Sequence, residues 1–333
     1  MKVLFCFYPL NVAWSHGVAL LSALCKQRGI ETELLMLGDY AAFGDCLRRH
    51  DVFCFSVVTR ADYEKSLFWM KWAHDAGKTV LLGGTWCGLN HPVPEFVHAV
   101  CRGDGETLPD FLINGNRKLF DESLVYSDLN ELPLPDYEMF SGVAFDRGMP
   151  ETAGKKVLPY VSSRGCLSRC VFCQSRTQPV FRVRTRVEED LSEIYSRHLP
   201  DLFWIGDATL PYCSQAWRAS WGEFRYPFAG YIRADIKPEH LEWLIDRGMV
   251  GCAFGVESGN ECFRNDVLGK QLSDGQLWRT IEMLQKYKLW YVPFFMYGFP
   301  GETMKLRTDT ALMERKIGGY PITWKYEQLS EVD

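Results

Sequence analysis

Three closely spaced cysteines are the feature of this sequence that points most directly to chemistry. Cys166, Cys170 and Cys173 follow the spacing C-x3-C-x2-C. Three thiolates can ligate three irons of one four-iron cluster and leave the fourth iron open, whereas four cysteine ligands would make a closed electron-transfer centre. An open iron is a place where a substrate or cofactor can coordinate. A zinc site, which needs a fourth ligand nearby, and thiols buried in the core are the alternatives.

The elements around these cysteines are expected to form a partial α/β barrel. From residue 151 onward, apolar runs alternate with helical patterns, and six strand–helix repeats are too few for a closed eight-stranded barrel. The side chains of the site should then cluster at the carboxyl ends of the strands. Strands are predicted at 157–162, 202–206, 228–232, 251–256, 291–297 and 323–328, and helices at 187–197, 238–247 and 277–287.

Polar residues interrupt the apolar runs at these strand ends. An acidic side chain suits an ammonium group, arginine suits a carboxylate, and Asp, Glu or Ser suit ribose hydroxyls. At any one position the alternative is a helix cap or a surface ion pair. The candidate ligand-binding residues of this region are Asp207, Arg233, Asp235, Glu257 and Ser258.

The first part of the chain predicts a Rossmann-like, doubly wound parallel sheet with helices on both faces. Strands are predicted at 3–8, 33–37, 52–58, 79–82 and 97–101, with helices ending before Gly29 and Gly77. Such sheets bind ligands beyond the carboxyl ends of their strands, although simple turn chemistry is the alternative for a Gly-Gly pair. No G-x-G-x-x-G follows the first strand, which argues against an ordinary dinucleotide site. The candidate contacts are Ser56, Thr59, Gly83, Gly84, Thr85, Gly103, Gly105 and Glu106.

The cysteine spacing, with Phe172 just before the last cysteine, resembles that of the radical S-adenosylmethionine (SAM) enzymes. The resemblance implies a 4Fe-4S cluster whose free iron binds the amino and carboxylate groups of SAM and cleaves SAM to a 5′-deoxyadenosyl radical. By the same resemblance, Asp207 corresponds to the acid that meets the SAM amino group, although the usual Gly-Gly-Glu run is Gly-Asp-Ala here. Arg233 and Asp235 then fall where polar residues reach the ribose or carboxylate, and Glu257 and Ser258 match a SAM-binding strand end.

The first part of the chain resembles the cobalamin-binding domain that precedes the radical SAM domain in one large subclass. The order strand, Ser-x-x-Thr, strand, Gly-Gly, then Gly-x-Gly-Glu carries this resemblance, and the Leu-Pro-x-Pro-Asp-Tyr stretch at 132–137 resembles the connection between the two domains. The Asp-x-His-x-x-Gly loop is absent, so we expect cobalamin to bind without a protein histidine, and we expect His16 to be a surface or helix-cap residue. The implied domains are cobalamin-binding at 1–125, a linker at 126–150 and the radical SAM partial barrel at 151–333.

Together these resemblances imply a cobalamin-dependent radical SAM methyltransferase that acts on an unactivated carbon or a phosphinate centre. One SAM would methylate the cobalt and a second would supply the radical. A rearrangement, cyclisation or ring contraction with the same cofactors is the alternative, and a non-catalytic cobalamin or redox sensor is an alternative of another class. The expected partners are a small-molecule or peptide substrate and an external electron donor such as flavodoxin or ferredoxin.

The composition narrows the class of protein further. A net charge of −5 over 333 residues, with no block of Lys or Arg, predicts no nucleic-acid partner, and no apolar run is long enough to span a membrane. Cysteines scattered through the chain indicate a reducing, cytoplasmic location. Most of them are expected in the core. For Cys213 and Cys262, near strand ends, a second cluster ligand or a covalent thiol is the alternative.

Overall fold

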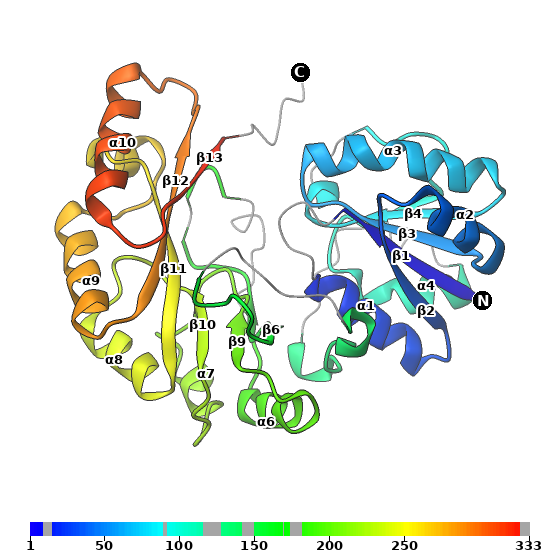
Figure 1. Ribbon diagram of the computed structural model, residues 1–333, viewed down its shortest axis with the longest axis horizontal. Coiled ribbons are helices and arrows are strands. Elements are labelled where there is room, and N and C mark those ends of the chain that lie inside the picture. The colour runs from blue at the N-terminus through cyan, green and yellow to red at the C-terminus, as the bar shows by residue number, and fades with distance from the viewer. Residues whose placement is uncertain are drawn as a thin grey trace. The chain divides into compact units, whose positions relative to one another are not determined.

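The computed structural model describes residues 1–8, 15–88, 92–115, 128–141, 150–168, 170–173 and 182–326. These residues form two compact units, the first within 1–141 and the second within 150–326. Each unit contains its own parallel sheet (Figure 1). The chain is therefore a mixed α/β protein with two parallel sheets.

The first unit contains a five-stranded parallel sheet in the order β2-β1-β3-β4-β5. The chain order reverses beside β1, as it does in doubly wound sheets. The parallel sheet predicted from the alternating apolar runs is confirmed. Its strands are β1 (Lys2–Phe7), β2 (Glu31–Met36), β3 (Val52–Ser56), β4 (Thr79–Gly83) and β5 (Ala99–Val100), and its helices are α1 (His16–Gln27), α2 (Tyr40–Arg49), α3 (Arg60–Asp75) and α4 (Leu108–Asn114).

Helices cover both faces of this sheet (Figure 1). Leu4, Phe53 and Phe55 pack with Phe43 of α2 and Trp69 of α3 in one buried cluster. The alternate strand residues face α1 and are as deeply buried, since successive side chains point to opposite faces of a strand. Burial on both faces explains why the central strands read as unbroken apolar runs.

The segment 128–141, part of the predicted linker, packs onto α1 of the first unit. Leu129 and Leu132 form a small buried cluster with Leu20. Asp136 Oδ2 accepts hydrogen bonds from Ser22 Oγ and Lys26 Nζ, both at 2.6 Å, while Asp136 Oδ1 accepts from the Met139 amide at 3.3 Å. Asp136 therefore both fixes a turn and ties this segment to α1.

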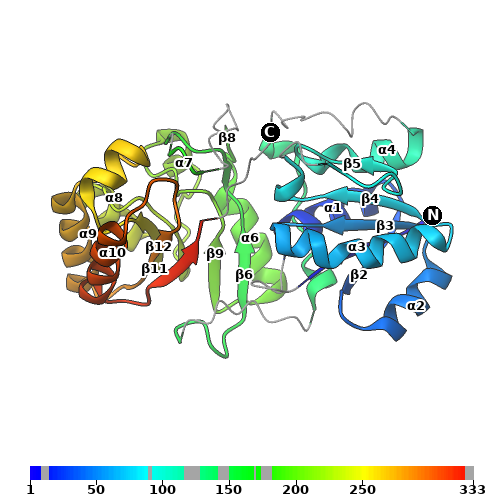
Figure 2. The same cartoon turned by 90° about the horizontal axis from the view of Figure 1, so that it is seen from above.

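The second unit contains a six-stranded parallel sheet whose strands follow one another in chain order, β13-β12-β11-β10-β9-β6. This sheet curls into a half-barrel with helices along its outer side (Figure 2). Its strands are β6 (Val157–Tyr160), β9 (Leu202–Ile205), β10 (Phe228–Tyr231), β11 (Met249–Glu257), β12 (Trp290–Tyr297) and β13 (Ile322–Lys325). Its helices are α6 (Val187–His198), α7 (Gln215–Ala219), α8 (Pro238–Asp246), α9 (Asp274–Lys286) and α10 (Met304–Ile317), and β7 (Ser163–Arg164) pairs antiparallel with β8 (Arg182–Val183).

The six strands of the half-barrel lie where the sequence predicts them, but α10 was not predicted. Only Thr310, Met313 and Ile317 of this helix are buried, and most of its other side chains are charged or polar. A helix with so narrow an apolar stripe gives a weak periodic signal. Among the described residues, no helix is long and apolar enough to cross a membrane.

Gly84 gives a direct test of the packing in the first unit. Its φ is +102°, and a Cβ atom built there would lie 2.3 Å from the Val57 carbonyl oxygen. Gly84→Ala should therefore lower the free energy of unfolding by about 2 kcal/mol or more, measured by urea denaturation of the full chain.

Gly77→Ala is the matched control. Gly77 also has a positive φ of +75°, but nothing lies within 4 Å of its added Cβ. Gly77→Ala should lower the free energy of unfolding by only about 1 kcal/mol, from backbone strain alone. Equal losses at the two positions would show that the contact with Val57 contributes nothing.

Candidate functional site

The three cysteines lie in the loop that follows β6 and β7, at the carboxyl end of the first strand of the half-barrel. We call residues 165–173 the cysteine loop. Cys170 is buried, whereas Cys166 and Cys173 are half-buried. The Ser168 amide donates to Cys166 Sγ at 3.4 Å, and the Cys173 amide donates to the Cys170 carbonyl at 3.1 Å. Among the described residues, no three Cys, His, Asp or Glu side chains are gathered closely enough to hold a metal ion.

Arg233 joins the cysteine loop to two neighbouring segments. Its guanidinium forms a bidentate pair with Asp235, with Nε–Oδ1 and Nη2–Oδ2 distances of 3.0 Å. It also donates to Ser168 Oγ at 2.7 Å and to the Lys270 carbonyl at 2.9 Å. The structure thus brings Arg233 against the cysteine loop, with Asp235 paired to its guanidinium.

Glu257 forms a second ion pair beside this loop. Lys270 Nζ lies 2.8 Å from Glu257 Oε1, and the two side chains are only 11% and 8% exposed. Lys270 Nζ also lies 5.9 Å from the centre of the Phe172 ring. Glu257 has a φ of +66°, an unfavourable conformation for a residue with a side chain. Sequence reasoning did not identify Lys270, because a single lysine in a turn carries no motif.

The two cations act on the cysteine thiols. Burial raises the pKa of the Cys170 thiol, whereas Lys270 and Arg233 act to lower it. Positive charge stabilises the thiolate, which is the form of cysteine that binds metal. Three soft sulfur donors with two cations beside them fit an anionic iron–sulfur cluster in ligand type and charge.

Asp207, which follows β9, is fully buried. Its carboxylate accepts hydrogen bonds from the Ser162 and Ser163 amides at 2.7 and 3.0 Å, and from their hydroxyls at 2.5 and 2.7 Å. Trp217 Nε1 donates to Ser162 Oγ at 2.7 Å. The carboxylate therefore faces the segment that leads from β6 into the cysteine loop, and its contact with the SAM amino group stays a prediction.

Ser258 lies in the interior of the second unit. It is fully buried, its hydroxyl accepts from the Asn260 amide at 3.2 Å, and it lies 3.4 Å from Thr310 Oγ1. Its carbonyl accepts from Arg264 Nη1 at 3.0 Å. The structure therefore places Ser258 behind Glu257, where it stabilises the turn at the end of β11.

The candidate cobalamin contacts lie at the carboxyl ends of β3, β4 and β5 in the first unit. Ser56 pairs in register with Gly83, and a Cβ atom at Gly83 would lie 3.4 Å from Cys101 Cβ. Thr85 begins a short 3-10 helix, and Glu106 is buried in another. Gly103 accepts a hydrogen bond from Cys101 Sγ at its carbonyl. These residues follow neighbouring strands at one edge of the sheet.

Three of these candidates also have structural roles that need no ligand. Thr59 is the N-cap of α3, where it forms a reciprocal capping box with Asp62. Gly84 is required by its close approach to the backbone of Val57, and a Cβ atom at Gly105 would lie 3.1 Å from Leu21 Cδ1. His16 is the first residue of α1, directly after the N-cap Ser15.

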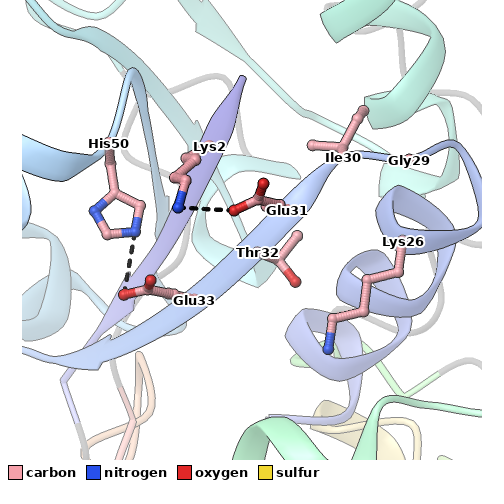
Figure 3. Close-up of a pocket in the computed structure, with 8 residues that line it drawn as sticks. All are labelled: Lys2, Lys26, Gly29, Ile30, Glu31, Thr32, Glu33 and His50. Atoms are coloured by element: carbon pink, nitrogen blue, oxygen red, sulfur yellow. Dashed lines mark ion pairs between the residues drawn. The ribbon is translucent and has the colours of Figure 1, made fainter.

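A polar hollow of about 390 Å³ lies at the opposite, amino-terminal edge of the same sheet (Figure 3). It is lined by residues at the starts of β1 and β2 and by His50, whose Nε2 faces Glu33 Oε2 at 3.3 Å. Lys2 pairs with Glu31 at 2.8 Å, and Lys26 pairs with Asp136 at 2.6 Å. Lys2 thus pairs within the hollow, whereas Lys26 pairs with a residue outside its lining, and none of the predicted site residues lines the hollow.

An exchange experiment tests the role of Asp207. The side chain of Asp207→Asn has only one oxygen that can accept hydrogen bonds. Some of the hydrogen bonds from Ser162 and Ser163 are therefore lost. Amide hydrogen exchange of the peptide that contains both serines should accelerate by about tenfold or more. Asp246→Asn, which changes a mostly exposed carboxylate, is the control and should leave that peptide unchanged. Equal exchange in both variants would contradict this role.

Wild type and Asp207→Asn should also differ in how their stability depends on pH. Burial raises the pKa of Asp207 from 3.8 to about 6, against the opposing effect of its four hydrogen bonds. The folded state then binds this proton more tightly, so the stability it contributes is present at low pH and is lost as the pH rises through about 6. The unfolding free energy of the wild type, relative to that of Asp207→Asn, should therefore fall as the pH rises from 3.8 to about 6. A constant difference across this window in urea unfolding would refute the raised pKa.

A double-mutant cycle tests the buried ion pair. Lys270→Met leaves the Glu257 carboxylate nearly buried without a partner, which should cost about 3 kcal/mol of unfolding free energy. Adding Glu257→Gln should restore most of that loss, because the uncompensated charge is removed. Simple additivity of the two losses would mean that the side chains do not interact.

Neither a comparison with protein-family models nor one with curated protein sequences finds a match for this chain. Among solved structures, coproporphyrinogen III oxidase HemN from Escherichia coli, described as a radical SAM enzyme, is 14% identical with a TM-score of 0.39 over 52% of this chain and 44% of its own. Elp3 from Methanocaldococcus infernus is 10% identical with a TM-score of 0.33 over 51% of this chain and 46% of its own. An NAD-complexed D-isomer specific 2-hydroxyacid dehydrogenase from Lactobacillus delbrueckii ssp. bulgaricus is 10% identical with a TM-score of 0.26, over 97% of this chain and 89% of its own. The chain thus spans less than half the length of the first two, and scores this low establish neither a family nor an activity.

Proposed function

We propose that this chain is a radical SAM enzyme whose cluster is held by Cys166, Cys170 and Cys173. The observation that carries the proposal is the position of these cysteines. They share one loop at the carboxyl end of β6, the first strand of a half-barrel whose strands follow chain order. Two cations, Arg233 and Lys270, act on the Cys170 thiol. When bound, the cluster and SAM would supply a 5′-deoxyadenosyl radical that removes hydrogen from the substrate.

The polar residues beside the cysteine loop suit the groups that SAM carries. The Arg233–Asp235 and Glu257–Lys270 pairs provide two cations and two carboxylates beside the cysteine loop. A zwitterionic amino acid group can exchange partners with such pairs, since its carboxylate suits the cation and its ammonium suits the acid. Asp207 would then act on SAM through the cysteine loop, by holding Ser162 and Ser163.

We further propose that this radical SAM enzyme is a cobalamin-dependent methyltransferase. It would act on a small molecule or peptide, with flavodoxin or ferredoxin as reductant. Its support is the parallel sheet of the first unit, in the order β2-β1-β3-β4-β5, with small and polar residues at the carboxyl ends of three strands. The proposed contacts are Ser56, Thr59, Gly83, Gly84, Thr85, Gly103, Gly105 and Glu106. Cobalamin would supply the methyl group to the substrate, while these residues would bind the cofactor against the backbone.

Anaerobic reconstitution with iron and sulfide tests the cluster. The full-length protein should bind about four irons and, with a reductant, convert SAM to 5′-deoxyadenosine. The triple variant Cys166→Ala/Cys170→Ala/Cys173→Ala should lose both properties. Cys262→Ser, which removes an exposed cysteine outside the cysteine loop, is the control and should retain both. Iron retained by the triple variant, or zinc bound by the wild type in place of iron, would overturn the proposal.

A binding measurement with hydroxocobalamin tests the cobalamin dependence separately from the radical SAM activity. The full chain should bind it, and Ser56→Trp should abolish binding by placing bulk at the carboxyl end of β3. Lys78→Trp, just before the amino end of β4, is the control at the opposite edge. A chain that cleaves SAM but binds no cobalamin would be a radical SAM enzyme of another subclass.

A further inference from the structure

We propose that Cys213 and His240 form a nucleophilic thiol–imidazole pair that takes up small disulfides of the glutathione type as a mixed disulfide. This proposal goes beyond the radical SAM function and does not depend on it. Cys213 Sγ lies 3.8 Å from His240 Nδ1, within hydrogen-bond reach for sulfur. Cys213 lies in the loop between β9 and α7 and is exposed, while His240 lies in the first turn of α8.

Neighbouring residues hold the imidazole beside the thiol. The ring of Tyr212, which is only 7% exposed, lies 5.3 Å from the His240 ring. The Tyr212 carbonyl accepts a hydrogen bond from Arg218 Nε at 2.6 Å, which fixes the backbone next to Cys213. A nucleophile with a base in reach and a third group that positions the base is the arrangement that activates nucleophiles.

The surroundings of His240 keep its imidazole neutral, which is the form that can accept a proton. Burial lowers the pKa of His240, and the positive charges of Arg218 and Lys237 lower it further, against the opposing effect of Glu239. The imidazole is therefore neutral near neutral pH, and Nδ1 can accept the thiol proton when the ring carries its hydrogen on Nε2.

The other cysteines outside the cysteine loop lack this combination. Cys6, Cys54 and Cys252 are buried, and burial raises their pKa. Cys262 is exposed, but no described histidine forms a hydrogen bond with it. Cys262 is therefore a control within the same protein, matched in exposure and lacking the base.

The reaction is a thiol–disulfide exchange. His240 Nδ1 takes the proton of Cys213, and the thiolate sulfur attacks one sulfur of oxidised glutathione. A bond forms between Cys213 Sγ and that sulfur as the disulfide bond of glutathione breaks. The departing glutathione thiolate takes up a proton from the His240 imidazolium, so Cys213 is oxidised, one glutathione is reduced, and no other reactant is needed.

Mass-spectrometric peptide mapping of the full chain, incubated with oxidised glutathione, tests the proposal. Cys213 should gain glutathione about tenfold or more faster than Cys262 near neutral pH. His240→Asn should bring the rate at Cys213 to within about twofold of that at Cys262, without changing the rate at Cys262. Alkylation by iodoacetamide should show the same order, because it measures nucleophilicity without a disulfide.

The controls keep the outcome interpretable. Unfolding curves establish that His240→Asn is folded, and the triple variant of the cysteine loop should react at Cys213 as the wild type does, whether or not a cluster forms. Equal rates at Cys213 and Cys262 in the wild type would overturn the proposal. A Cys213 rate that is unaffected by His240→Asn would also overturn it.

Discussion

The cysteine loop depends on a buried carboxylate. Asp207 accepts four hydrogen bonds from two consecutive serines, and these serines connect β6 to the loop. Removing a charge from water is costly unless it is hydrogen-bonded, and here two amides and two hydroxyls offset part of that cost. The carboxylate thus fixes the start of the loop at the end of β6, where an open metal site would have to be formed. The observed contacts of Asp207 position the start of the loop, and its contact with the SAM amino group stays a prediction.

The charges next to the loop are balanced in pairs. Arg233 pairs with Asp235, and Lys270 pairs with Glu257, so that each of these charges, partly buried in the first pair and nearly buried in the second, has an opposite neighbour. Such pairs are a weak source of stability, because desolvation offsets much of their attraction. Their effect here is to keep two cations next to Cys170 while the region stays close to neutral overall. Each cation therefore keeps an opposite charge beside it whether or not a metal is bound.

The sequence predicted positions well and contacts poorly. Apolar runs located the strands of the half-barrel, because buried parallel strands are apolar on both faces, although the edge strand β13 is mostly exposed. The rule that site residues follow strand ends placed Asp207, Arg233 and Glu257 correctly in the fold. It did not show that Asp207 faces Ser162 and Ser163, or that Lys270 pairs with Glu257, since both contacts depend on the tertiary path of loops. Helix α10 was missed because few of its residues are buried.

The glycines of the first unit show why a ligand pattern can be ambiguous. Glycine at a strand end, which has no Cβ atom, allows another group to approach closely. That group can be a bound cofactor or another part of the protein itself. At Gly84 the approaching group is the carbonyl of Val57, and at Gly105 it is the side chain of Leu21. At Thr59 the hydroxyl that is predicted to contact a ligand also caps α3. The argument for a cofactor at this edge therefore depends most on Ser56, for which the described residues show no such close approach. Replacing Ser56 separates a binding site from a well-packed turn.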